Sequence, residues 1–79
     1  MTIAIIIAGL EITATAQNVT AAQAAGIEST ISRVARSAEK SATKRGLGVQ
    51  GAIKQHINAA VGFNNKVHGA VVTVSYRNA

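Results

Sequence analysis

The sequence predicts a small α+β domain of two layers, with the element order β-α-α-β and a helical hairpin packed on a sheet. Three observations lead to this fold class. Both ends of the chain are rich in β-branched residues, the middle repeats apolar residues at helical spacing, and glycines interrupt that middle region near residue 46. A chain of 79 residues accommodates one domain, which we assign to residues 1–79.

The first element is expected to be a strand over residues 2–15. Ile3, Ile5 and Ile7 alternate with side chains that are also apolar, which is typical of a strand buried on both faces. After Gly9 the apolar side chains fall on one side only. We interpret this glycine as a bulge that redirects the strand.

The first helix is expected from about residue 21 to about residue 44. Thr20 and Gln23 have the spacing of a capping box, in which each side chain satisfies a backbone N–H group of the first turn. Gly46 is the candidate for the left-handed residue that ends the helix. The apolar stripe of this helix consists of Ala24, Ile27, Ile31, Val34, Ala38 and Ala42.

A second helix is expected over about residues 50–61, ended by Gly62 and followed by a turn at Asn64-Asn65. The last strand is expected over residues 70–76, where valines alternate with polar side chains.

Two strands from one chain do not make a stable sheet. The chain also has no cysteine and only two aromatic residues, so its core is thin. We therefore expect a homo-oligomer, with the sheet completed by dimerisation. Ile3, Ile5 and Ile7 are the predicted interface residues.

The charge distribution is the most informative feature for function. Eight basic residues outnumber three acidic ones, which gives a formal net charge of +5. Arg33, Arg36, Lys40 and Lys44 are spaced three or four residues apart, so on a helix they form one stripe, with the acidic residues off it. The stripe continues into Arg45 and a glycine-rich segment. This pattern favours an anionic partner, above all a nucleic acid, although such a stripe is often only the solvated face of a helix.

The glycine segment from Gly46 to Gly51 fits the G-x-G-x-x-G pattern of dinucleotide sites. A helix precedes it where that motif requires a strand, so we exclude this function. Gly48-Val49-Gln50-Gly51, between two helices of a βααβ unit, resembles the GXXG loop of the KH family. The alternative is an ordinary helix–helix connection that needs glycine for its turn.

The KH resemblance implies that Gly48 and Gly51 approach the phosphates of single-stranded RNA or DNA and that Lys54 adds charge. The sequence departs from the family pattern at three points. The first helix is longer, a third helix is absent, and Val and Gln occupy the middle of the loop, where the family usually carries a basic residue.

No catalytic, metal or cofactor site is predicted. The chain has neither cysteine nor aspartate, and His56 and His68 are its only imidazoles. The apolar run of residues 3–10 is too short to span a bilayer, which takes about 20 residues. We expect a cytoplasmic protein with no membrane partner.

The leading hypothesis is a non-enzymatic nucleic-acid-binding protein that contacts the phosphate backbone of DNA or RNA. Its weak expected base specificity follows from the scarcity of aromatic side chains. The alternative is a protein–protein module, either a phage-type inhibitor of a host complex that offers an acidic surface or a small self-assembling structural subunit. The predicted phosphate contacts are Arg33, Arg36, Lys40, Lys44, Arg45, Gly48, Gly51 and Lys54.

Overall fold

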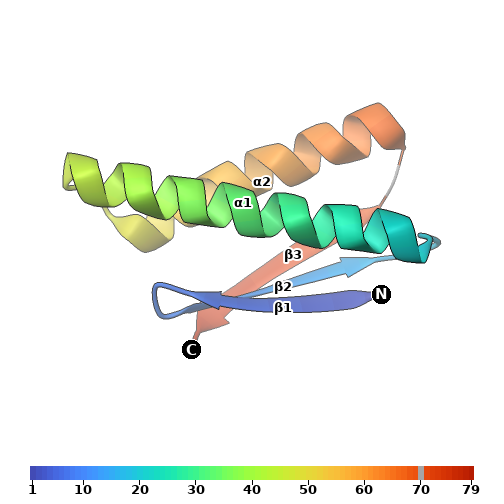
Figure 1. Ribbon diagram of the computed structural model, residues 1–79, viewed down its shortest axis with the longest axis horizontal. Helices are drawn as coiled ribbons and strands as arrows, with labels where there is room; N and C mark the ends of the chain where they lie inside the picture. The colour runs from blue at the N-terminus through green and yellow to red at the C-terminus, as the bar shows by residue number, and fades with distance from the viewer. Residues whose placement is uncertain (70) are drawn as a thin grey trace.

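A three-stranded antiparallel sheet is covered on one face by two helices (Figure 1). This arrangement is seen in a computed structural model that describes residues 1–69 and 71–79. The elements in chain order are β1 (Thr2–Ile7), β2 (Leu10–Ala16), α1 (Ala21–Arg45), α2 (Val49–His68) and β3 (Val72–Asn78). The α+β class and the two layers are confirmed. The predicted β-α-α-β order is wrong, because the first strand is a hairpin and the order is β-β-α-α-β.

The turn between β1 and β2 consists of Ala8 and Gly9. Both residues have positive φ, 53° and 73°, and Ile7 pairs with Leu10 across the turn. Two central residues with positive φ are the mark of a type I′ turn, whose twist matches that of the flanking strands. Gly9 therefore reverses the chain, and its interpretation as a bulge is wrong. The sequence gives no turn signal at Ala8, since alanine rarely adopts a conformation with positive φ.

We expect the substitution Ala8→Asn to stabilise the protein by about 1 kcal/mol, because a left-handed conformation costs alanine roughly that much and asparagine tolerates it. Urea unfolding of the two proteins measures the difference. Ala8→Val is the contrasting variant, since a β-branched residue fits a positive φ poorly and should lower the midpoint. Equal midpoints for all three proteins would contradict the strain at this turn.

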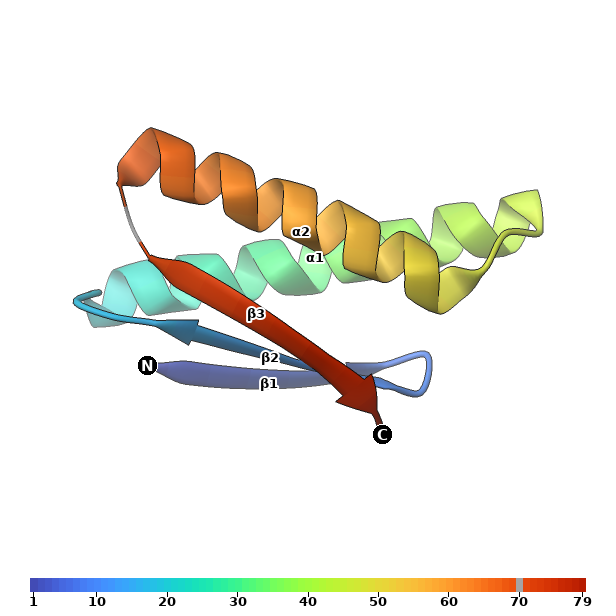
Figure 2. The same cartoon turned by 180° about the vertical axis from the view of Figure 1, so that it is seen from behind.

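β2 is the central strand, with β1 and β3 at the two edges of the sheet. The sheet is thus completed within one chain, which removes the argument for dimerisation from a two-stranded sheet. Ile3 is buried, and Ile5 and Ile7 are half-buried against the same core under the helices. Figure 2 shows that the opposite face of the sheet carries no helix.

The core lies between the sheet and the helical hairpin. Leu10 and Ile12 of β2 meet Ile53 and Ile57 of α2, and all four side chains are almost completely buried. The contribution of α1 to this core is Ile31 and a row of alanines. Small side chains allow α1 to lie close to α2, but they bury little apolar area, so the four large aliphatic residues dominate the core.

The ends of α1 agree with prediction. The side chain of Thr20 accepts a bond from the Gln23 N–H group at 3.1 Å, and the side chain of Gln23 accepts one from the Thr20 N–H group at 2.9 Å. Both bonds of the capping box are therefore present. Gly46 ends the helix with a φ of 68°.

The predicted end of α2 at Gly62 is wrong. Gly62 and Asn64-Asn65 lie inside the helix, which ends at Gly69 with a φ of 64°. Asn65 forms no turn. Instead, its amide donates to the Val72 carbonyl oxygen at 3.0 Å and accepts from the Val72 N–H group at 3.1 Å. This side chain fixes the start of β3 at Val72, two residues after the predicted start at residue 70, which itself lies outside the described residues.

Candidate nucleic-acid interface

Arg33, Arg36, Lys40 and Lys44 are all exposed on the outer surface of α1. We call these four residues the basic stripe. The opposite surface of the helix is buried, with Ile31, Ala35, Ala38 and Ala42 against α2 and the sheet. Because these four buried residues fix the rotation of α1 about its axis, the basic stripe faces the solvent.

The charges of the basic stripe are not neutralised by ion pairs. Among residues 1–69 and 71–79, the one salt bridge joins Arg77 and Glu11 on the uncovered face of the sheet. Glu28 and Glu39 belong to α1 but lie on its flank, beside the stripe. Unpaired cations in a row attract a polyanion more strongly than a mixed surface of the same net charge.

The basic stripe ends at the connection between the helices, which we call the glycine turn (residues 46–51). Lys44 and Arg45 occupy the last turn of α1, and Gly48 is the N-cap residue of α2. No side chain of residues 1–69 and 71–79 caps α2, and its first backbone bond runs from Ala52 N–H to the Gly48 carbonyl at 3.1 Å. The N–H groups of residues 49–51 therefore lack an acceptor within the described part of the chain. Such groups at a helix N-terminus favour an anion.

Gly48 and Gly51 are exposed, and a Cβ built on either would meet nothing within 4 Å among the described residues. The two middle residues of the GXXG sequence are directed elsewhere. Val49 packs against the core, and the Gln50 side chain donates to the Ala8 carbonyl oxygen at 3.0 Å. These two contacts hold the glycine turn on the β1–β2 hairpin, so its surface consists of the backbone at Gly48 and Gly51 together with the exposed Leu47 side chain.

Lys54 is separated from the other predicted phosphate contacts. Its ammonium group lies 5.9 Å from the centre of the Tyr76 ring on β3. α2 lies over the β3 side of the sheet and α1 over the β1 side (Figures 1 and 2). The contact with Tyr76 therefore places Lys54 on the side of α2 toward β3. The candidate interface therefore contains the basic stripe, Gly48 and Gly51, whereas Arg45, three residues after the buried Ala42, lies in the last turn of α1 on the side opposite the stripe.

Tyr76 ties β3 to α2. Its hydroxyl donates to Asn58 Oδ1 at 2.7 Å and lies 3.4 Å from the Lys54 carbonyl oxygen. Burial of the phenol raises its pKa above the ordinary value of 10.0. The folded protein therefore holds the phenol proton more tightly than the unfolded chain does.

This pKa shift predicts a loss of stability at alkaline pH. The neutral phenol contributes to the free energy of unfolding, and this contribution is fully present below about pH 10. It disappears as the pH rises through the higher pKa that the phenol has in the folded protein. We expect Tyr76→Phe to cost about 1 kcal/mol at neutral pH through the lost hydrogen bond. The difference in free energy of unfolding between the native protein and Tyr76→Phe should become smaller above about pH 10. Urea unfolding from neutral to alkaline pH measures this difference, and a value that does not change with pH would contradict the raised pKa.

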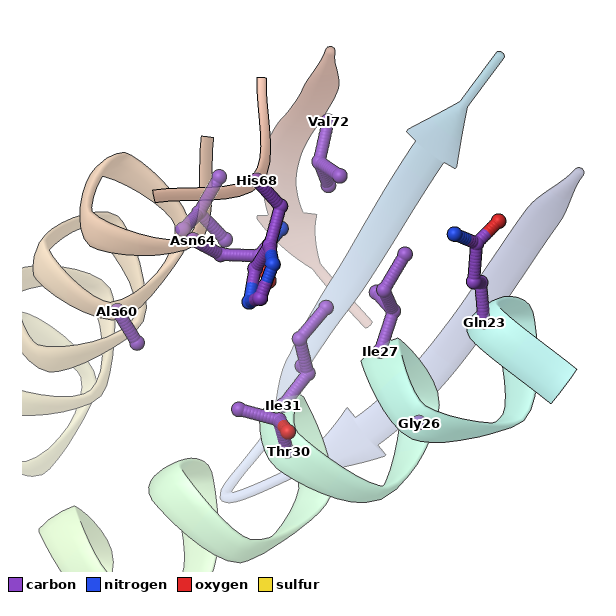
Figure 3. Close-up of a pocket in the computed structure, with 10 residues that line it drawn as sticks. Gln23, Gly26, Ile27, Thr30, Ile31, Ala60, Asn64, His68 and Val72 are labelled. Carbon is purple, nitrogen blue, oxygen red and sulfur yellow. The ribbon is translucent and has the colours of Figure 1, made fainter. Parts of the chain in front are cut away.

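A groove of about 470 Å³ opens where α1 and α2 diverge, near the start of α1 and the end of α2. Figure 3 shows Ile27 and Ile31 of α1 on one side and Asn64 and His68 of α2 on the other. No group of three His, Cys, Asp or Glu side chains within the described residues is placed to hold a metal ion. His56 is exposed and lies outside this groove.

Comparisons with protein-family models, with curated proteins and with solved structures find no match for this chain. In the part of the chain that the structure describes, neither helix has the apolar length that a bilayer crossing requires.

Proposed function

We propose that this protein binds nucleic acid through the phosphate backbone, with the basic stripe and the glycine turn as its contact surface. One observation carries the proposal. Within the described residues, a row of exposed cations without ion pairs on α1 leads to a helix N-terminus without a side-chain cap, where Gly48 and Gly51 leave the backbone accessible. Charged side chains and free N–H groups are the two means by which proteins hold phosphates.

The dimensions of the basic stripe suit a nucleic-acid strand. Arg33 and Lys44 are eleven residues apart, which on an α-helix corresponds to about 16 Å. A strand of a duplex presents a phosphate about every 3.4 Å along the axis. Side chains of this length therefore reach several phosphates of one strand. The two arginines add the capacity to bind a phosphate with two parallel hydrogen bonds.

Base recognition has little support on this surface. The chain has only Phe63 and Tyr76 as aromatic residues. Tyr76 is engaged with α2, and Phe63 lies in the second half of α2, away from the glycine turn. Stacking on aromatic rings is the common means of holding single-stranded bases. We therefore propose contacts to the backbone with weak sequence preference, and we propose that the protein acts as a homodimer, so that two such surfaces act together.

Fluorescence anisotropy with labelled oligonucleotides of random sequence tests the proposal. The panel consists of single- and double-stranded DNA and RNA, each titrated between about 50 and 300 mM salt. We expect the logarithm of the association constant to fall linearly with the logarithm of the salt concentration. Absence of binding to all four probes at the lowest salt, or binding that does not change with salt, would overturn the proposal.

The second candidate function is a protein–protein module, and a specific surface favours it. Phe63 and Val67 are four residues apart on α2 and both are exposed, as is Val71, and Phe63 is 69% exposed. Exposed apolar clusters of this kind often mark protein interfaces. An interface of this composition would persist at high salt, which distinguishes it from the contact of the basic stripe with phosphates.

A further inference from the structure

The outer edge of β1 has a definite set of free backbone groups. The Ala16 N–H group donates to the Met1 carbonyl oxygen at 3.0 Å, which makes these two residues a hydrogen-bonded pair. Hydrogen-bonded pairs alternate along antiparallel strands. The backbone groups of Ile3, Ile5 and Ile7 therefore point to β2, and those of residues 2, 4 and 6 point outward, where the described residues form no further strand.

The other edge of the sheet is occupied at its start. On β3 the alternation directs the backbone of Val72 outward, and the Asn65 side chain occupies both of its groups. β3 also carries the charge of Arg77, and the Lys54 ammonium lies 5.9 Å from the centre of its Tyr76 ring. β1 has none of these devices, because residues 2–7 contain no charge and no proline. An uncharged, β-branched edge strand is a template for pairing with another strand.

We propose that a second copy of this chain pairs with the β1 edge, antiparallel, with Ala4 on the two-fold axis. This register joins the outward backbone groups of Ala4 in both copies and those of Thr2 in one copy with Ile6 in the other. The result is a continuous six-stranded sheet. The inference rests on the homodimer within the proposed function and does not depend on nucleic-acid binding.

Side-chain packing supports a second copy as the occupant. Ile6 is 66% exposed on the uncovered face of the sheet, and the register places it beside Thr2 of the other copy. On the helix side, Ile3 of one copy lies opposite Ile5 of the other, and both belong to the core of their own chain. On the two-fold axis, Ala4 of one copy lies opposite Ala4 of the other, and two such small side chains fit there without a clash. Strand pairing thus extends the thin core across the interface.

The flank of α1 above β1 is also self-complementary. Glu28, Ser32 and Arg36 follow one another at four-residue spacing, so they lie on one side of the helix. The groove residues Gln23 and Thr30 lie on the opposite side, toward α2. In an antiparallel pair of α1 helices centred near Ser32, Glu28 of one copy faces Arg36 of the other.

The widths of the two layers agree with this pairing. Strands lie about 4.8 Å apart and packed helices about 10 Å, so six strands accommodate four helices on one face. The dimer then carries two basic stripes on that same face, on neighbouring α1 helices, with Arg33, Lys40 and Lys44 of each stripe outside the pairing of Glu28 with Arg36. A single polyanion can contact both.

Sedimentation equilibrium of the purified protein, without nucleic acid, is the first test, and we expect a dimer at micromolar concentration. Because the chain has no cysteine, Ala4→Cys introduces a unique thiol at the proposed axis. A short bismaleimide should link two Ala4→Cys chains. Thr73→Cys is the matched control, because Thr73 is exposed on the same face at the opposite edge, so its two copies are about 28 Å apart. A monomer, or equal linking of both variants, would overturn the proposal.

Charge at position 4 provides a second test that does not depend on cross-linking. Two lysines or two glutamates face each other on the axis, so Ala4→Lys and Ala4→Glu should each weaken the dimer roughly fivefold. A mixture of the two variants should form a heterodimer, which native mass spectrometry detects. The same pair of substitutions at Thr73 should change neither result. Dimers of Ala4→Lys as tight as the native dimer would contradict the register.

Discussion

Replacement of Arg33, Arg36, Lys40 and Lys44 by glutamine in one variant is expected to abolish most of the affinity for nucleic acid. Each phosphate contact contributes about 0.7 to the slope of the logarithm of the association constant against that of salt, so the slope should fall by roughly 3. At about 0.1 M salt the same loss corresponds to a roughly thousandfold weaker complex. Fluorescence anisotropy over a salt series gives the affinity and the slope together.

The control for this variant must have the same net charge. The quadruple variant lowers the formal charge from +5 by four, and the double variant Lys66→Glu with Arg77→Glu lowers it by the same amount. Lys66 lies near the end of α2, and Arg77 lies on the uncovered face of the sheet. We expect the double variant to keep most of the native slope. Equal losses in both variants would mean that net charge, and not the basic stripe, determines binding.

The sequence predicted α1 well because its signals are local. The capping box at Thr20 and Gln23 and the left-handed Gly46 each depend on a few neighbouring residues, and both are present. The basic stripe was predictable for the same reason, since the apolar stripe fixes which surface of α1 faces outward. One residue of the buried surface of α1, Ala35, was absent from the predicted apolar stripe, because an alanine gives a weak hydrophobic signal.

The errors arise where tertiary contacts override local patterns. Ala8 in the hairpin turn is held in a strained conformation, and Gln50 of α2 binds its carbonyl oxygen. Asn65 would form a turn in isolation, but here it pairs with the backbone of Val72 from within a helix. Lys54 follows the glycine turn closely in sequence, yet the rotation of α2 directs it to β3. None of these contacts has a signature in a short segment of sequence.

Replacement of Ile57 by alanine is expected to have the largest effect on stability. The Ile57 side chain is fully buried and packs with Leu10, Ile12 and Ile53, the other large aliphatic residues of the core. Removal of a buried isoleucine costs about 2–5 kcal/mol, because the transfer energy is lost and a cavity remains. Small domains have little more stability than this. Urea unfolding should therefore show a midpoint close to zero denaturant.

Leu47→Ala separates this effect from the loss of any large aliphatic side chain. Leu47 lies in the glycine turn and is 54% exposed, so its removal should change the free energy of unfolding by about 0.5 kcal/mol or less. Ile57→Ala also shows whether a loss of nucleic-acid binding comes from unfolding or from the contact surface. Ile57 is remote from the basic stripe, so Ile57→Ala should bind nucleic acid in proportion to its folded fraction. Conditions that restore folding, such as an excluded osmolyte, should then restore binding as well. The quadruple variant of the basic stripe should gain nothing from the same treatment, because its defect lies in the contact surface and not in the core.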